Sequence, residues 1–167
     1  FDKLSVKTVH SWNAIIAGHS NIGKDDNILS ILNQMMAEDI QPNPITFISI
    51  LNACSHLGLV IEGEMCFNAM LEVYGIIPSS QHYACMVDMF SRAGQFSKAL
   101  AMLEKVPASD HLPLLSAFLG ACHKGVNAEL GRWAFERSLQ LDGKSRAAYI
   151  CMGNIYAISG MYACASV

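Results

Sequence analysis

Apolar residues recur at spacings of three and four along most of the chain, as at Leu32, Met35, Met36 and Ile40. This period is typical of amphipathic helices, and no segment sustains the strict apolar–polar alternation of a half-buried strand. The pattern predicts helices over residues 11–22, 25–38, 44–57, 60–74, 80–93, 96–105, 112–123, 127–141 and 147–159.

Glycine and proline divide these helices into repeating units. Five glycines follow helix-like runs at intervals of 31 to 36 residues: Gly23, Gly58, Gly94, Gly125 and Gly160. Pro42, Pro78 and Pro107 close the first three units, because proline cannot continue a helix. A helix, a glycine turn, an antiparallel helix and a proline exit make a unit of about 35 residues. The sequence therefore predicts an all-α fold, an α-solenoid of stacked helical hairpins.

The composition is apolar, with 52% hydrophobic and 15% charged residues and a mean hydropathy of +0.30. Two uncharged segments, 40–61 and 147–167, raise the question of a membrane helix. The first contains Pro42 and Pro44, and the second contains Asn154, polar serines and two glycines. Stacked hairpins bury both faces of most helices, which explains the composition, so we expect no membrane span.

The charge and the cysteine content argue against several classes of protein. Asp and Glu (14) outnumber Lys and Arg (11), so the chain lacks the basic footprint of an obvious nucleic-acid binder. The six cysteines form no close pair and are expected to be buried thiols in a reducing compartment. His82 and Cys85 supply two metal ligands where structural zinc needs four, so we expect no metal and no cofactor.

Several blocks resemble the plant pentatricopeptide repeat family: SWNAIIAG at 11–18, QPNPITF at 41–47, NACSHLGLV at 52–60 and HYACMVD at 82–88. The unequal unit lengths are similar to the C-terminal end of the subclass that mixes long and short repeats. The resemblance implies a right-handed superhelix with the end of a preceding repeat at 1–8 and repeats at 9–43, 44–79 and 80–111. A first extension motif follows at 112–145 and a truncated second one at 146–167. We expect the chain to end a longer array.

The resemblance implies sequence-specific binding of single-stranded RNA in mitochondria or chloroplasts. This subclass typically specifies sites of cytidine-to-uridine RNA editing. The deaminase domain of some members carries His-x-Glu and Pro-Cys-x-x-Cys motifs, and neither occurs in this sequence. We therefore expect no catalysis and no small-molecule substrate, with a deaminase or another editing protein contacted through residues 112–167.

The family reads one base per repeat through a residue on the first helix and the last residue of the repeat. By resemblance these pairs are Asn13 with Asn43, Ile48 with Ser79, and Ala84 with His111. The asparagine amides offer both donor and acceptor groups, and the family pattern for that pair favours C or U. Ile48 offers no hydrogen-bonding group, and His111 departs from the usual acidic residue. Ser116 and Leu115 of the extension motif suggest no base contact.

Arg132, Arg137, Lys144 and Arg146 form a basic cluster, but Glu129, Glu136 and Asp142 are interspersed, which indicates a mixed solvated surface. Two other functions stay open. The first is a protein-interaction or structural subunit of an organellar ribonucleoprotein or other complex. Its repeats would no longer carry the residue pairs that recognise bases. The second is a tetratricopeptide-like peptide binder, against which the uneven unit lengths argue.

Overall fold

The computed structural model describes residues 7–22, 28–124 and 127–160 of the 167-residue chain. Within these ranges the chain forms nine α-helices, one short 3-10 helix and no strand. The elements are α1 (Val9–Ile22), α2 (Ile28–Ala37), α3 (Pro44–Leu57), α4 (Val60–Glu72), α5 (Ser80–Arg92), α6 (Phe96–Leu103), η1 (Ala108–Asp110), α7 (His111–Lys124), α8 (Ala128–Leu141) and α9 (Arg146–Ile158).

The predicted all-α solenoid is confirmed. Helix ends differ from the predicted ones by two residues or fewer, apart from the start of α2, where residues 25–27 lie outside the described residues. The first helices α3, α5, α7 and α9 begin within one residue of the expected unit starts at 44, 80, 112 and 146. Gly23, Gly125 and residues 1–6 and 161–167 also lie outside the described residues.

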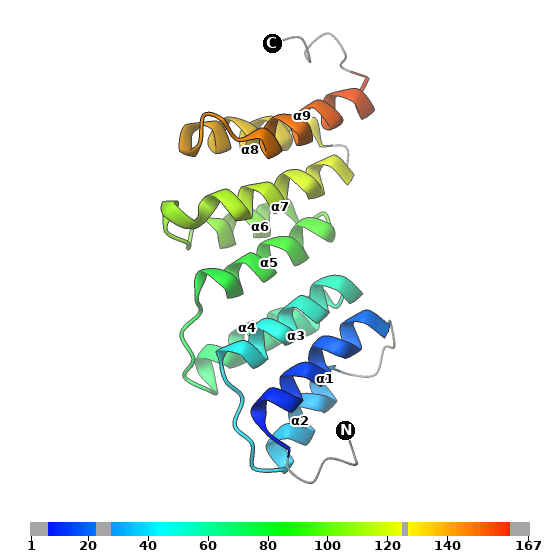
Figure 1. The fold of residues 1–167 in the computed structure, drawn as a ribbon, viewed down its shortest axis with the longest axis vertical. Helices are drawn as coiled ribbons and strands as arrows, with labels where there is room; N and C mark the ends of the chain where they lie inside the picture. The colour runs from blue at the N-terminus through cyan, green and yellow to red at the C-terminus, as the bar shows by residue number, and fades with distance from the viewer. Residues whose placement is uncertain (1–6, 23–27, 125–126, 161–167) are drawn as a thin grey trace.

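The hairpins stack into two layers (Figure 1). The first helices α1, α3, α5, α7 and α9 pack side by side in chain order and form the first-helix layer. The second helices α2, α4, α6 and α8 lie behind them, each against its own partner and the next first helix. The main contacts among the described helices therefore lie within hairpins and between neighbouring hairpins, as expected of a solenoid.

The junction between the first two hairpins shows why helices begin and end where they do. Asn43 is the N-cap of α3, its side chain accepts the Thr46 N–H, and Pro44 occupies the first turn. Proline fits there because the first-turn N–H groups have no helical partner. At the other end Gly58 adopts φ = 73°, a left-handed conformation that glycine tolerates, and its N–H caps Cys54 O.

The core is a row of large apolar side chains between the two layers. Trp12, Phe47, Phe90 and Phe118 are almost fully buried. Aromatic pairs connect hairpins through the core, including Phe67 with Tyr83 at 5.4 Å and Phe96 with Phe118 at 5.6 Å between ring centroids. None of the described helices is long and apolar enough to cross a membrane.

Four cysteine thiols belong to this core. Burial raises the pKa of Cys54, Cys85 and Cys122 to about 12 and that of Cys66 to about 11. A thiol with such a pKa stays protonated at neutral pH and is a poor nucleophile. These four residues therefore act as small buried side chains, as the sequence predicts. Cys151 is only half-buried, which departs from that expectation, and Cys164 lies outside the described residues.

Candidate nucleic-acid interface

On each first helix a subset of the exposed and half-buried side chains forms one stripe, at the three- and four-residue spacing of a helix face. We call the combined stripes the open face; it comprises His10, Ala14 and Ala17 of α1, Ile45, Ile48, Asn52 and His56 of α3, Gln81, Ala84, Asp88 and Arg92 of α5, Pro113 and Ser116 of α7, and Ala147, Ile150 and Asn154 of α9. The first helices pack side by side (Figure 1), so the stripes of neighbouring first helices are expected to lie next to one another.

Asn13 and Asn43, the predicted pair of the first repeat, are brought together by Thr46 of the next hairpin. The Thr46 hydroxyl donates to Asn13 Oδ1 at 2.7 Å and accepts the Asn43 N–H at 3.1 Å. Asn43 Oδ1 accepts the Thr46 N–H at 2.9 Å. Asn13 is 8% exposed at the edge of the open face, and its Nδ2 is buried with no hydrogen-bond partner among the described residues. The junction thus holds one amide donor without an acceptor.

The second predicted pair, Ile48 and Ser79, is not joined in this way. Ser79 caps α5 and its N–H donates to His82 Nδ1 at 3.1 Å. His82 Nε2 lies 2.9 Å from Pro44 O and donates to it, so the ring is the neutral tautomer with its proton on Nε2. Ile48 is half-buried on the open face and offers only apolar surface.

We expect the stability of the fold to depend on pH through His82. The side chain is 1% exposed, and its burial lowers its pKa below the ordinary 6.5, against an opposing contribution from the Pro44 hydrogen bond. Well above pH 6.5 the His82 side chain is neutral in both the folded and the unfolded state, so it adds no pH dependence. Below it the unfolded state binds the proton more readily, so the free energy of unfolding falls as pH drops towards the folded pKa.

Thermal unfolding between about pH 7 and about pH 5 measures this loss. His82→Gln should flatten the decline relative to wild type, whereas the exposed His56→Gln should leave it unchanged. Equal slopes in all three proteins would show that His82 does not contribute.

In the third predicted pair, Ala84 lies half-buried on the open face while His111 is 7% exposed. His111 Nε2 lies 2.7 Å from Val106 O, which directs the ring back into its own repeat. Next to it the Ser80 hydroxyl donates to the Asp110 carboxylate, and this bond, with that from Ser109, lowers the pKa of Asp110. The structure does not bring Ala84 and His111 together through a shared contact.

At the other end of the first helices a charged network crosses from α3 to α5. Ser55 Oγ donates to Asp88 Oδ2 at 2.6 Å, and Arg92 Nε donates to the same oxygen at 2.8 Å. One turn earlier Cys85 Sγ lies 3.1 Å from Asn52 Oδ1. Ser55 with Asp88, Asn52 with Cys85 and Asn13 with Thr46 are all separated by 33 residues. These hydrogen bonds fix the register between neighbouring first helices.

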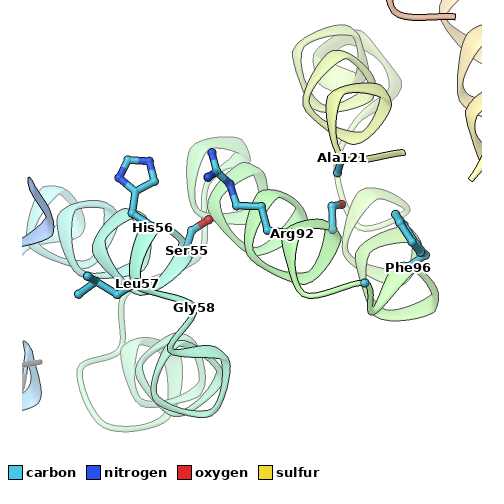
Figure 2. A pocket seen from close by; sticks show the side chains of 9 residues that line it. Ser55, His56, Leu57, Gly58, Arg92, Phe96 and Ala121 are labelled. Atoms are coloured by element: carbon cyan, nitrogen blue, oxygen red, sulfur yellow. The ribbon is translucent and has the colours of Figure 1, made fainter. Parts of the chain in front are cut away.

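A cavity of about 600 Å³ opens beside this network, lined by the ends of α3 and α5 together with Phe96 and Ala121. Figure 2 shows the Arg92 side chain extending from α5 towards the end of α3, where His56 also projects. Both side chains belong to the open face and are exposed. Both side chains carry nitrogen atoms that donate hydrogen bonds, and they are placed where a phosphate is able to approach.

Arg132 and Arg137 of the basic cluster in the fourth unit lie elsewhere, whereas Arg146 is the first residue of α9. The Arg132 guanidinium stacks 5.9 Å from the centre of the Tyr156 ring, and Arg137 Nη1 donates to Gln140 at 3.1 Å. Both arginines belong to α8 of the second layer. Among the described residues no group of three or more His, Cys, Asp or Glu side chains is placed to hold a metal ion.

Sequence reasoning missed Thr46 and the network of Ser55, Asp88 and Arg92. A signal for Thr46 was present, because Asn43 and Thr46 have the spacing of a capping box, in which each side chain bonds the other's backbone N–H. The Ser55–Asp88 bond joins two separate repeats and leaves no local signal.

The family profiles and the related proteins that match this chain agree on one family. The profile described as "PPR repeat family" matches residues 7–56, and that described as "PPR repeat" matches residues 45–73 and 82–110. The chloroplastic pentatricopeptide repeat-containing protein At3g49170 of Arabidopsis thaliana is 41% identical over 162 residues, which is 97% of this chain and 19% of that protein. The mitochondrial protein At4g32430 of the same plant is 34% identical over 157 residues, 94% of this chain and 21% of that protein.

Solved structures share the fold. The pentatricopeptide repeat protein PPR10 from maize aligns over 93% of this chain and 23% of its own, with a TM-score of 0.69 and 22% identity. PPR10 in complex with an 18-nt psaJ RNA element aligns with a TM-score of 0.61 and 21% identity, over 96% of this chain and 22% of its own. The chain spans about a fifth of the length of most of these proteins.

Proposed function

Because the chain belongs to the pentatricopeptide repeat family, we propose that its open face binds single-stranded RNA in a sequence-specific manner. The observation that carries the proposal is the junction of Asn13, Thr46 and Asn43, where two amides meet and one buried amide donor has no acceptor. Unpaired bases present acceptors on their edges that satisfy such a donor. PPR10, which shares the fold, has been crystallised with an RNA element.

Within this proposal Asn13 and Asn43 contact the base edge, and the chemistry of their amides fits a pyrimidine. Ile48, Ser79, Ala84 and His111 occupy the corresponding places in the next two repeats. Ile48 and Ala84 contribute apolar surface against which a base packs. Ser79 and His111 hold their own repeats, through His82 and Val106, and contribute little to base choice.

Arg92 and His56 contact the RNA backbone. They lie on the open face beside the cavity, and Asp88 neutralises part of the Arg92 charge while orienting its guanidinium. A phosphate contact adds affinity without sequence preference and is weakened by salt.

A titration of the full-length protein with a pool of single-stranded RNA tests this placement. Arg92→Gln should weaken binding about equally for all sequences and reduce the slope of log affinity against log salt by about one. The matched control is Arg137→Gln on α8, which should change neither. Equal losses in both variants, or in neither, would contradict RNA binding along the open face.

The finer function that we propose is recognition of a site of cytidine-to-uridine RNA editing, without catalysis by this chain. Residues 112–167 then bind a deaminase or another editing protein. Exposed apolar side chains on α9 outside the open face support a protein contact there, with Tyr149 and Ile158 each at least 50% exposed. A location in mitochondria or chloroplasts agrees with the relatives that are named mitochondrial or chloroplastic.

A second candidate function is that of a protein-interaction subunit in an organellar complex. The net charge of −3 favours it, as do the apolar residues Ile48 and Ala84 at positions expected to contact a base. Such a subunit binds no RNA through the open face. The salt titration above separates the two, because Arg92→Gln would then leave RNA binding unchanged.

A further inference from the structure

Thr46 lies at the centre of the first junction and is fully buried. Its hydroxyl carries one proton, and the nearest acceptor is Asn13 Oδ1 at 2.7 Å, closer than Asn43 Oδ1 at 3.1 Å. The hydroxyl oxygen accepts the Asn43 N–H, which orients the proton away from Asn43 and towards Asn13. Thr46 thus belongs to one repeat and holds a side chain of the preceding one.

This contact fixes which way the Asn13 amide faces. An asparagine side chain carries an acceptor and a donor on the same planar group, and a half-turn about its last bond exchanges them. With Oδ1 held by Thr46, Nδ2 is the group that remains, buried and without a partner in the part of the chain that the structure describes. A buried donor without an acceptor is destabilising, so an arriving acceptor is favoured.

The Asn43 amide is held in the same sense. Its Oδ1 accepts the Thr46 N–H at 2.9 Å, which leaves its Nδ2 as the available group. Thr46 therefore engages the carbonyl oxygens of both asparagines, one through its hydroxyl and one through its backbone.

We propose that Thr46 is a positioning residue for base recognition. Its hydroxyl holds Asn13 Oδ1, so that the first junction offers the amide donors of Asn13 and Asn43 to RNA. The junction then selects a base with hydrogen-bond acceptors on the facing edge. The inference rests on the proposed function, since it concerns how the pair Asn13 and Asn43 meets RNA. Thr46 itself does not touch the base.

The junction between the second and third repeats lacks a hydrogen bond of this kind. The residue in the place of Thr46 is His82, which bonds Ser79 and Pro44 O, and the residue in the place of Asn13 is the apolar Ile48. Among the described junctions, only the first therefore fixes the amide of an asparagine that contacts a base, so a change at Thr46 should affect one base of the RNA only.

The test selects bound sequences from a pool of single-stranded RNA with a random segment, using the full-length protein. The base contacted by the first junction is the position whose preference disappears in Asn13→Ala. At that position Thr46→Val, which keeps the side-chain shape without the hydroxyl, should reduce the preference about fivefold or more. Thr46→Ser, which keeps the hydroxyl, should restore it. Thr46→Ala replaces Thr46→Val if the latter does not fold.

Asn127→Ala is the matched control for a lost helix cap. Asn127 caps α8 in the second layer through a 3.1 Å bond from the Leu130 N–H, far from the open face. It should lower the thermal midpoint and leave every base preference unchanged.

Loss of preference at the single position in Thr46→Val, with recovery in Thr46→Ser, supports the inference. An unchanged preference in Thr46→Val overturns it and leaves the proposed function standing. Equal losses at all positions, matched by Asn127→Ala, also overturn it, because the role is then structural. A wild-type protein with no preference at any position overturns the proposed function and the inference together.

Discussion

Phe118→Ala is expected to lower the free energy of unfolding by about 3–5 kcal/mol, the usual cost of removing a fully buried aromatic ring. Phe118 is 0% exposed in the centre of α7. Its ring lies 5.6 Å from Phe96 of α6 and 6.2 Å from Trp133 of α8, so one side chain joins three helices. The cavity left behind cannot collapse without moving both neighbours.

Denaturant unfolding and amide hydrogen exchange check this prediction. Because a solenoid is held by neighbouring contacts, protection should fall most in α6, α7 and α8 and least in α1 and α3. Ile77→Ala is the control, since Ile77 is 80% exposed and its loss should change stability by less than about 0.5 kcal/mol. A similar small effect for Phe118→Ala would contradict its place in the core.

Asn13→Ala is expected to abolish the base preference of the full-length protein at one position of its RNA target. A good amide–base contact contributes about 1–3 kcal/mol of discrimination, which corresponds to roughly five- to more than a hundredfold in relative affinity. Asn43→Ala should affect the same position, because Thr46 holds both amides at one junction. The preferences at other positions should persist.

Competition binding with RNAs that differ at single positions measures this effect. Asn68→Ala, an exposed asparagine of α4 in the second layer, is the matched control and should change no preference. If Asn13→Ala weakened binding to all RNAs equally, or affected a different base from Asn43→Ala, the two residues would not form one reading pair.

The sequence was sufficient to predict the fold, because the signals for the helices are local. Pro44 after the capping residue Asn43 sets the start of α3, and Gly58 in a left-handed conformation sets its end. The apolar period identifies which faces are buried, and the recurring unit length then implies stacking.

The site was predictable only in part, because it depends on which side chains meet between repeats. The hydrogen bond from Thr46 to the buried Asn13 joins residues 33 apart in the sequence. Which residues of α1 and α3 face one another is set by the packing of the two helices. The sequence likewise did not reveal that His82 bonds Pro44 O or that His111 turns back to Val106 O. Each of these contacts pairs the Nε2 of a buried histidine ring with a backbone carbonyl, whereas His111 Nδ1 has no hydrogen-bond partner among the described residues.

Crosslinking can locate bound RNA on the surface of the protein. The full-length protein is irradiated with single-stranded RNA that carries 4-thiouridine, and the crosslinked peptides are identified by mass spectrometry. If RNA binds along the open face, crosslinks should lie in α1, α3 and α5, on peptides that contain open-face residues such as His10, Ile45 and Gln81. Crosslinks confined to α2, α4, α6 and α8 of the second layer would contradict binding along the open face.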